Sequence, residues 1–238
     1  MTVFTASQPV RLTPTALAGI FNFLQHNPQS VGIPSSTQFA LEDQNHAFEI
    51  IFKGHGFTYH NHNPIGGTLT SLEIDRPAGT FAYKFSAMNV QLGGPSGLVA
   101  AVNAHNYGAV LHMLLPGHDN INGSAFNDYL VDYNGHDRIT GGLGSDIMFG
   151  NHGFDTFVIH AGTGSDHDQL RGFVYGSAAN HDKLLLYPDT GLTNLAQVHA
   201  HETYDASHNV VLHDTSGDTV TFVGVHNKAL LTAIDFHF

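Results

Sequence analysis

The sequence contains no cysteine among its 238 residues, so neither disulfides nor thiolate metal sites are available to it. Only 12% of the residues are Asp, Glu, Lys or Arg, about half the share of an average soluble domain. No apolar run approaches the roughly 20 residues that a membrane-spanning helix needs. These shortages exclude a disulfide scaffold, and we expect no membrane insertion.

Basic residues are also scarce: 8 Lys and Arg face 20 Asp and Glu, for a net charge of −12. The imbalance lies almost wholly in residues 114–238, because residues 1–113 are close to neutral. An acidic half repels nucleic acid and anionic membrane surfaces and attracts cations. No basic cluster offers a footprint for phosphates. We therefore predict a cation partner and no nucleic acid.

The first ten residues have neither the basic leader nor the apolar core of a Sec signal peptide. Taken alone, they predict a cytosolic protein. The repeat described below changes that prediction.

Residues 1–113 are predicted to form a small α+β region. Thr13-Pro14 is a typical helix start, and apolar residues recur at helical spacing from there to about Asn27. A second helical pattern covers residues 98–115, with a weak point at Tyr107-Gly108. Between them we expect a turn-rich linker over residues 29–36 and a β-meander over residues 37–92. The meander's breaks are expected at Gly54, Gly56, 64–67 and 77–79.

Residues 114–158 are five consecutive blocks of nine residues in one register, and such internal repeats are the first thing to seek in a sequence. Glycine holds the fourth position in four blocks, Phe126 being the exception. Aspartate holds the sixth position in all five: Asp119, Asp128, Asp137, Asp146 and Asp155. An apolar residue holds the eighth: Ile121, Leu130, Ile139, Met148 and Phe157.

This register predicts a coil of short strands joined by glycine turns, with the apolar side chains inward. If two blocks make one coil, aspartates two blocks apart stack on the same edge, about 4.8 Å from one another. Carboxylates that close repel strongly unless a cation lies between them. Carboxylate and carbonyl oxygens in an irregular shell suit Ca²⁺ better than Mg²⁺, and zinc prefers nitrogen or sulfur.

The block Gly141–Phe149 matches in full the pattern G-G-x-G-x-D-x-U-x, where U is apolar, and the other blocks match in part. The segment thus resembles the RTX, or haemolysin-type, calcium-binding repeat family. The resemblance implies a right-handed parallel β-roll in which each calcium ion takes two aspartates from blocks two apart, together with main-chain oxygens.

The resemblance implies three calcium sites in this chain. The first uses Asp119 and Asp137, with the carbonyls of Leu115, Gly117, Asp132 and Asn134. The second uses Asp128 and Asp146, with the carbonyls of Ser124, Phe126, Gly141 and Leu143. The third uses Asp137 and Asp155, with the carbonyls of Tyr133, Gly135, Gly150 and His152. A possible fourth joins Asp146, through Gly142 and Gly144, to either Asp166 or Asp168.

The resemblance extends beyond the blocks. Residues 155–186 look like the end of such rolls in secreted proteins, and residues 209–238 look like a serralysin-like C-terminal cap that carries a type I secretion signal. Val210–Leu212 and Val220–Val223 read as a closing hairpin. The implied domains are 1–113, an α+β region; 114–175, the calcium-binding roll; and 176–238, the cap with its export signal.

The implied location is outside the cell or on its surface. A roll whose carboxylates need neutralising should stay unfolded at low cytosolic calcium, pass the type I secretion apparatus, and fold in extracellular calcium, because binding free energy is then folding free energy.

The chain also has 19 histidines. His60 with His62, and His199 with His201, would share a face if they lie on strands, although surface turn positions are the simpler interpretation. His118 and His136 hold the variable fifth position of their blocks. Residues 201–205 do not form H-E-x-x-H, and residues 94–97 do not form a nucleophile elbow.

We therefore predict a secreted, non-enzymatic calcium-binding protein that is mainly β. One alternative is a secreted haem or transition-metal binder that uses the histidines. Another is a surface or filament protein that self-assembles through its β edges.

Overall fold

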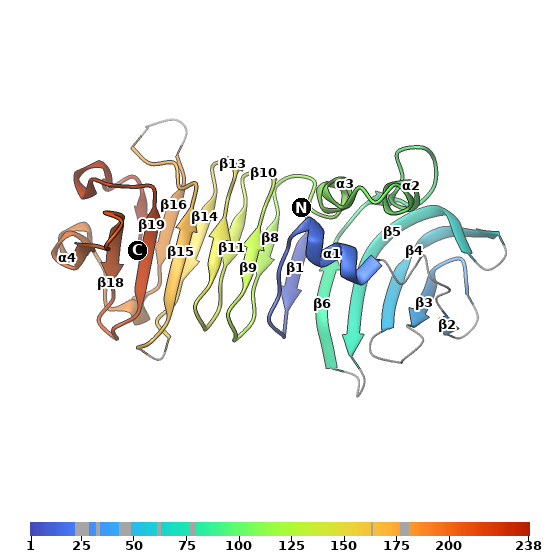
Figure 1. The fold of residues 1–238 in the computed structure, drawn as a ribbon, viewed down its shortest axis with the longest axis horizontal. Helices are drawn as coiled ribbons and strands as arrows, with labels where there is room; N and C mark the ends of the chain where they lie inside the picture. The colour runs from blue at the N-terminus through green and yellow to red at the C-terminus, as the bar shows by residue number, and fades with distance from the viewer. Residues whose placement is uncertain are drawn as a thin grey trace. The chain divides into compact units, whose positions relative to one another are not determined.

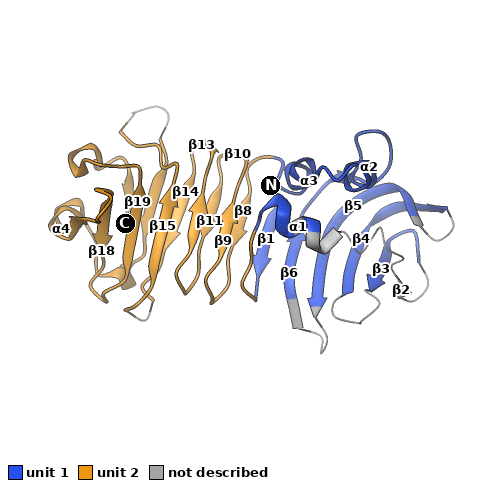
Figure 2. Ribbon diagram, viewed as in Figure 1, with its two compact units in different colours: residues 1–7, 12–116 blue, residues 8–11, 117–238 orange. Residues whose placement is uncertain are grey.

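The computed structural model describes residues 1–21, 29–31, 34–42, 49–60, 63–76, 80–162, 164–176 and 181–238. The chain divides into two compact units, which Figure 2 colours separately. Unit 1 holds residues 1–7 and 12–116, and unit 2 holds residues 8–11 and 117–238. The division therefore falls close to the predicted boundary at residue 113, whereas residues 117–175 and 176–238 lie in one unit because their strands share sheets.

Unit 1 is an antiparallel sheet in the order β2-β3-β4-β5-β6-β1, with β7 paired to β5. Its strands are β1 (Val3–Ala6), β2 (Gln29–Val31), β3 (Gln38–Glu42), β4 (Glu49–His60), β5 (Asn63–Arg76), β6 (Thr80–Ser86) and β7 (Val90–Gln91). Alternate residues are buried, as the period-two pattern predicts; Ile50, Phe52, Leu72 and Phe85 are examples.

The β-meander is confirmed, but its predicted breaks are not. β4 runs through Gly54 and Gly56, and β5 runs through residues 64–67. The pairing of β4 with β5 shifts register beside Gly54 and again between His55 and Tyr59, so these glycines lie in bulges of continuous strands. The predicted linker over residues 29–36 is also wrong in part, because Gln29–Val31 is a strand paired with β3. Residues 77–79, the last predicted break, lie outside the described residues.

The helices of unit 1 are α1 (Pro14–Phe21), α2 (Leu98–Asn103) and α3 (Tyr107–Leu114). The backbone N–H of Ala16 donates to Thr13 Oγ1 at 3.2 Å, which confirms the predicted helix start. Residues 22–28, where the first helix was predicted to end, are outside the described part of the chain. The second helical pattern is two helices, and the break lies just before Tyr107, where the Asn106 side chain caps α3.

Unit 2 contains two stacks of short parallel strands. Along the roll in Figure 1, strands of one stack alternate with strands of the other. One stack is β8 (Asn120–Asn122), β11 (Arg138–Thr140), β14 (Thr156–Ile159), β16 (Lys183–Leu186) and β20 (Phe236–His237). The other is β9 (Tyr129–Val131), β12 (Ile147–Phe149), β15 (His167–Arg171) and β19 (Thr219–Val223), extended antiparallel by β18 (Val210–His213) and β17 (Glu202–Tyr204). The pairing of β18 with β19 confirms the predicted hairpin.

The remaining elements of unit 2 lie in its turns and at its C-terminal end. Two-residue strands β10 (Asn134–Gly135) and β13 (His152–Gly153) pair in parallel. The helical elements among the described residues of unit 2 are α4 (Leu195–Ala200) and the short 3-10 turns η2 (Pro188–Thr190) and η3 (Lys228–Leu230). None of the helices in the described ranges is long and apolar enough to span a bilayer.

In the parallel strands, equivalent positions of blocks that are two apart in the sequence pair with one another. Ile139 pairs with Ile121 on one side and Phe157 on the other, and Met148 pairs with Leu130. Each of the five eighth-position side chains is fully buried. The apolar residues thus form the core of a roll in which each coil takes two blocks.

Candidate metal centre

The sixth-position aspartates form two rows joined by hydrogen bonds. In each row, the backbone N–H of one aspartate donates to Oδ1 of the aspartate in the next coil, 18 residues later. The distances are 2.8 Å from Asp128 N to Asp146 Oδ1 and 2.9 Å from Asp137 N to Asp155 Oδ1. The structure therefore places Asp119, Asp137 and Asp155 in one row and Asp128 and Asp146 in the other.

Both rows continue past the nine-residue repeat. Asp146 N donates to Asp168 Oδ1 at 2.9 Å, across 22 residues, whereas Asp166 N donates to Asp218 Oδ1. Asp168, and not Asp166, is thus the next member of the row that holds Asp146.

Asp182 extends the other row, because Asp155 N donates to its Oδ1 at 2.9 Å across 27 residues. Asp182 is not among the site residues predicted from the sequence. Its spacing could have revealed it, since an apolar residue, Leu184, follows two positions later, as in every block.

In several aspartates of the rows, the second carboxylate oxygen, Oδ2, has no hydrogen-bond partner among the described residues. Oδ2 of Asp137, Asp146 and Asp155 is buried and has no hydrogen-bond donor among the described residues. A buried carboxylate oxygen without a partner is costly, because ionised groups lose their hydration. A divalent cation between the coils removes that cost, so this donor set fits calcium.

Burial also changes the acidity of these carboxyls. It raises the pKa of Asp146 to about 8 and that of Asp155 to about 7, although backbone hydrogen bonds act in the opposite direction. It likewise raises the pKa of Asp168 to about 7 and raises that of Asp128. In the absence of a cation, the folded roll would hold protons that free aspartates release.

Glycine at the first position of a block leaves room for this oxygen. A methyl group built on Gly141 would collide with Oδ2 of Asp146, and one on Gly150 would collide with Oδ2 of Asp155. The oxygen therefore lies against bare backbone, where neighbouring carbonyl groups can share an ion with it.

Each predicted set has one carbonyl and one aspartate beside the same glycine. The carbonyl oxygen of Gly117 and the carboxylate of Asp137 both lie against Gly135. In the second set, the carbonyl of Gly141 and the carboxylate of Asp128 lie against Gly123. In the third, the carbonyl of Gly135 and the carboxylate of Asp155 lie against Gly153.

Other predicted carbonyls already accept hydrogen bonds. Ser124 O accepts from Leu143 N at 3.2 Å, and Tyr133 O accepts from His152 N at 3.4 Å. The Ser124 backbone N–H and hydroxyl also donate to Asp128 Oδ2, at 2.6 and 3.0 Å. The second predicted site therefore differs from the others, because its first aspartate already has protein donors on that oxygen.

The remaining predicted residues occupy turns or lie elsewhere. Gly142 and Gly144 have left-handed backbone angles, with φ of +110° and +97°, and Asn134 lies in β10. Phe126 is 47% exposed. Leu115 belongs to unit 1, so its role in the first site stays a prediction.

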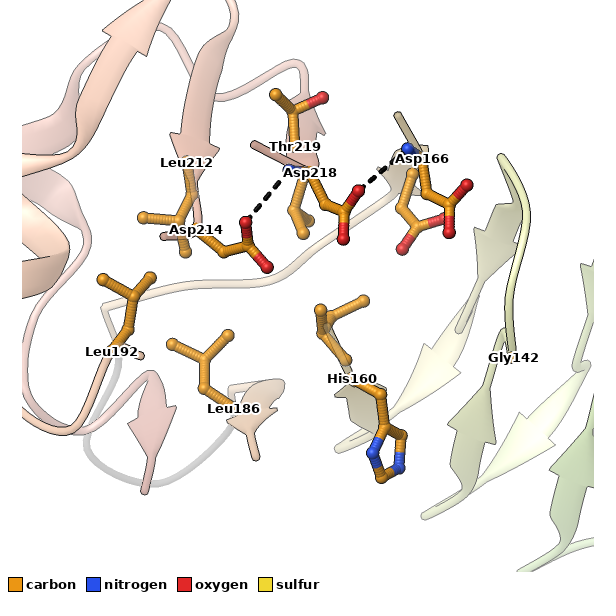
Figure 3. Close-up of a pocket in the computed structure, with 12 residues that line it drawn as sticks. Gly142, His160, Asp166, Leu186, Leu192, Leu212, Asp214, Asp218 and Thr219 are labelled. Atoms are coloured by element: carbon orange, nitrogen blue, oxygen red, sulfur yellow. Dashed lines mark hydrogen bonds between the residues drawn. The ribbon is translucent and has the colours of Figure 1, made fainter. Parts of the chain in front are cut away.

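A pocket at the C-terminal end of the roll is lined by four acids: Asp166, Asp168, Asp214 and Asp218. Figure 3 shows three of these acids linked by hydrogen bonds: Asp218 N donates to Asp214 Oδ1, and Asp166 N donates to Asp218 Oδ1. The imidazole of His160 points away from them. Burial favours a higher pKa for Asp218, but donors including Asp166 N, Ser216 Oγ and Gly162 N outweigh it and lower the pKa. Protein donors already stabilise this carboxylate.

Several histidines make hydrogen bonds or ring stacks, among them His118, His136 and His199. His199 and His201 were expected to share a face if they lay on a strand, but they lie in and just after the helix α4. His199 Nδ1 lies 2.8 Å from Glu202 Oε2. His62 is outside the described residues. Within those residues, the one cluster of three potential metal-ligating side chains contains only aspartates. A haem or transition-metal site therefore stays a prediction.

Comparison with known proteins agrees with this geometry. Residues 122–157 match the RTX calcium-binding nonapeptide repeat, in four copies. These repeats cover the strands and turns that carry the buried, donor-free carboxylate oxygens. The matched segment is therefore a run of RTX calcium-binding repeats within a protein that is mainly β.

Among curated proteins, none matches the chain. Among solved structures, one that is similar is the AlgE6R3 subunit of the Azotobacter vinelandii mannuronan C5-epimerase, with 22% identity over 51% of this chain and 78% of that one, and a TM-score of 0.35. Another is the extracellular lipase LipA of Serratia marcescens, with 14% identity over 90% of this chain and 31% of that one, and a TM-score of 0.35. The chain thus spans about a third of the lipase's length.

Proposed function

We propose that the protein is a secreted calcium-binding protein without enzymatic activity, whose right-handed roll folds as it binds extracellular calcium. One observation carries the proposal: three successive aspartates, Asp137, Asp146 and Asp155, each bury a carboxylate oxygen for which the described residues supply no donor. The RTX match over the same residues supports calcium as the ion.

The proposed sites follow the two rows. Three sites join Asp119 to Asp137, Asp128 to Asp146, and Asp137 to Asp155. A fourth joins Asp146 to Asp168, which accepts its backbone N–H. Asp182 closes the other row, because its Oδ2 already accepts the backbone N–H of Val174 at 2.8 Å.

Secretion follows from the same chemistry. Sites with extracellular-type affinities, in the range of about 0.1–1 mM, stay empty at cytosolic calcium concentrations and fill outside the cell. The carboxylates then repel in the cytosol and keep the roll unfolded, which suits export through the type I apparatus. Outside, mass action stabilises the folded roll.

The test is a calcium titration of the full chain, followed by circular dichroism and isothermal titration calorimetry. We expect β structure to increase with calcium and three or four ions to bind. In Asp146→Asn, which alters two proposed sites, the titration should shift to higher calcium. Asp205→Asn is the matched control, because the Asp205 side chain lies in an exposed turn of the cap, where its donors among the described residues are Ser207 and Asn209. A roll that is fully folded in chelator and binds no calcium contradicts the proposal.

Export has a separate test. Cells that carry a type I secretion apparatus should release the protein, and cells that lack its transporter should retain it. Retention in both strains contradicts the secretion part of the proposal and leaves the calcium sites unaffected.

A further inference from the structure

The third block departs from the repeat at its first position. Gly123, Gly141 and Gly150 hold that position in blocks two, four and five, whereas Asp132 holds it in block three. Where glycine leaves room for the carboxylate of its own block, this block places a second carboxylate. The Asp132 side chain is fully buried.

Three carboxylates converge at this point. One oxygen each of Asp119, Asp132 and Asp137 lies within 4.8 Å of the others, and all three side chains are buried. Both oxygens of Asp132, and Oδ2 of Asp137, have no hydrogen-bond donor in the described part of the chain. A buried, fully donor-free carboxylate aimed at two others is a much stronger sign of a cation than an exposed acidic cluster.

The main-chain oxygen of Asp132 has a different role. It accepts a hydrogen bond from the side-chain amide of Asn151. The resemblance assigned that carbonyl to the first calcium site, but the structure brings the side chain of Asp132 to the aspartates of that site.

We propose that the side chain of Asp132 is a direct third carboxylate ligand, which makes the Asp119–Asp132–Asp137 site the tightest cation site of the roll. This inference rests on the proposed calcium-dependent roll. Ligand charge is one of the quantities that set calcium affinity. Two carboxylates neutralise a divalent ion, whereas three leave one negative charge and favour a trivalent lanthanide over calcium.

A shared proton is the competing account of the cluster. Burial, together with the neighbouring Asp137, raises the pKa of Asp132 to about 10. A proton between Asp132 and Asp137 would satisfy one oxygen pair and leave the second oxygen of Asp132 buried without a donor among the described residues. A cation satisfies all three side chains, which is why the geometry favours it.

Terbium provides a local readout, because tyrosine transfers excitation to bound Tb³⁺ and Tyr133 follows Asp132 directly. We expect the full-length protein to show one tight terbium site, about tenfold or more stronger than the rest. Asp132→Asn keeps the shape and removes the charge, and it should abolish that tight phase. Asp205→Asn, in the exposed turn of the cap, should leave the tight phase intact.

A second variant guards against a folding defect in Asp132→Asn. Asp132→Gly restores the residue of blocks two, four and five, so the roll has a first-position residue that it accepts elsewhere. It should still fold with calcium, as followed by circular dichroism, and lack the tight terbium phase. Tyr133→Phe should dim the emission without changing the affinity measured by calcium competition.

The outcomes separate the two proposals. An unchanged tight phase in both Asp132 variants would overturn the role of Asp132 and favour the shared proton. Absence of any calcium response in the wild type would instead overturn the calcium-dependent roll. Loss of the tight phase in a variant that still folds with calcium supports Asp132 as a ligand.

Discussion

Buried aspartates occur in both the roll and the cap, yet their surroundings differ. In the roll, Asp146 accepts one backbone N–H on Oδ1 and has no described donor for Oδ2. In the cap, Asp235 accepts Gly176 N on Oδ1 and Thr232 N and Oγ1 on Oδ2, at 2.7–3.0 Å. Asp218 is likewise bonded on both oxygens.

This difference separates two ways to bury a carboxylate. Donors from the protein stabilise the ionised form of Asp218, and its pKa is lowered. Donors are too few for Asp146, and its pKa is raised to about 8. Asp218 and Asp235 of the cap thus have protein donors on both oxygens, whereas Oδ2 of Asp146 in the roll has none among the described residues. We expect calcium to change the stability of the roll and to leave that of the cap nearly unchanged.

The largest expected effect comes from Asp146→Ala, which removes a carboxylate shared by two proposed sites and the bond from Asp128 N. We expect it to lower the free energy of unfolding in calcium by about 3 kcal/mol or more, and to have little effect in chelator. Asp235→Ala removes cap bonds instead and should destabilise equally with and without calcium. Urea denaturation of both variants, with and without calcium, measures these losses. If the loss of unfolding free energy depends on calcium equally in the two variants, the proposed difference between roll and cap is wrong.

The next effect comes from Gly150→Ala, because the added methyl group collides with Oδ2 of Asp155. The carboxylate must turn from its position between the coils, so we expect the calcium concentration for half-folding to rise about tenfold. Gly172→Ala is the control, since a methyl group there meets no atom within 4 Å, although its φ of +73° adds a backbone strain that is independent of calcium. If both variants raise the calcium midpoint by the same factor, the effect of Gly150→Ala does not come from displacing Oδ2 of Asp155.

The sequence predicted the two rows over residues 119–155 because the spacing of nine residues is constant there. Beyond Asp155 the coils lengthen to 22 and 27 residues, so counting in nines cannot find Asp168 or Asp182. A shorter spacing persists: each row aspartate lies two residues before a buried apolar side chain. This spacing identifies Asp168, before Leu170, and Asp182, before Leu184.

Other features depend on contacts that no local pattern contains. β1 pairs with β6, far along the chain, and a four-residue strand has too little periodicity of its own to be recognised. The bulges that carry β4 through Gly54 depend on its partner β5. The side-chain role of Asp132 depends on two aspartates that only the coil brings near it.

Proton release is the third prediction. Without calcium, the folded roll holds protons on Asp146 and Asp155, with pKa values of about 8 and about 7, whereas the unfolded chain releases them near the ordinary 3.8. A raised carboxyl pKa means that the calcium-free roll loses stability as pH rises from about 4 to about 8. Calcium must displace these protons from any roll that is already folded when it binds, so binding at pH 6.5 should release more of them than binding at pH 9.

Calorimetry in buffers of different ionisation enthalpy measures this release, because each released proton adds the heat of its buffer. Asp218→Asn serves as the control, since a carboxyl whose pKa is lowered holds no proton at either pH. Identical heats in all buffers at pH 6.5 would show that the roll's aspartates are ionised before calcium binds.

The smallest expected effect tests the fifth position of the blocks, which supports the rows without binding the ion. His118, His136 and Phe154 stack in successive coils, and His136 Nδ1 accepts the backbone N–H of Phe154 at 3.0 Å. In the other row, Asn127 Oδ1 does the same for Ser145 N at 2.9 Å. His136→Ala removes both the acceptor and the stack and should cost about 1–2 kcal/mol at saturating calcium. His136→Asn restores the acceptor alone and should recover about half of that loss in urea denaturation. If His136→Asn recovers none of the lost stability, ring stacking and not the hydrogen bond stabilises this part of the coil.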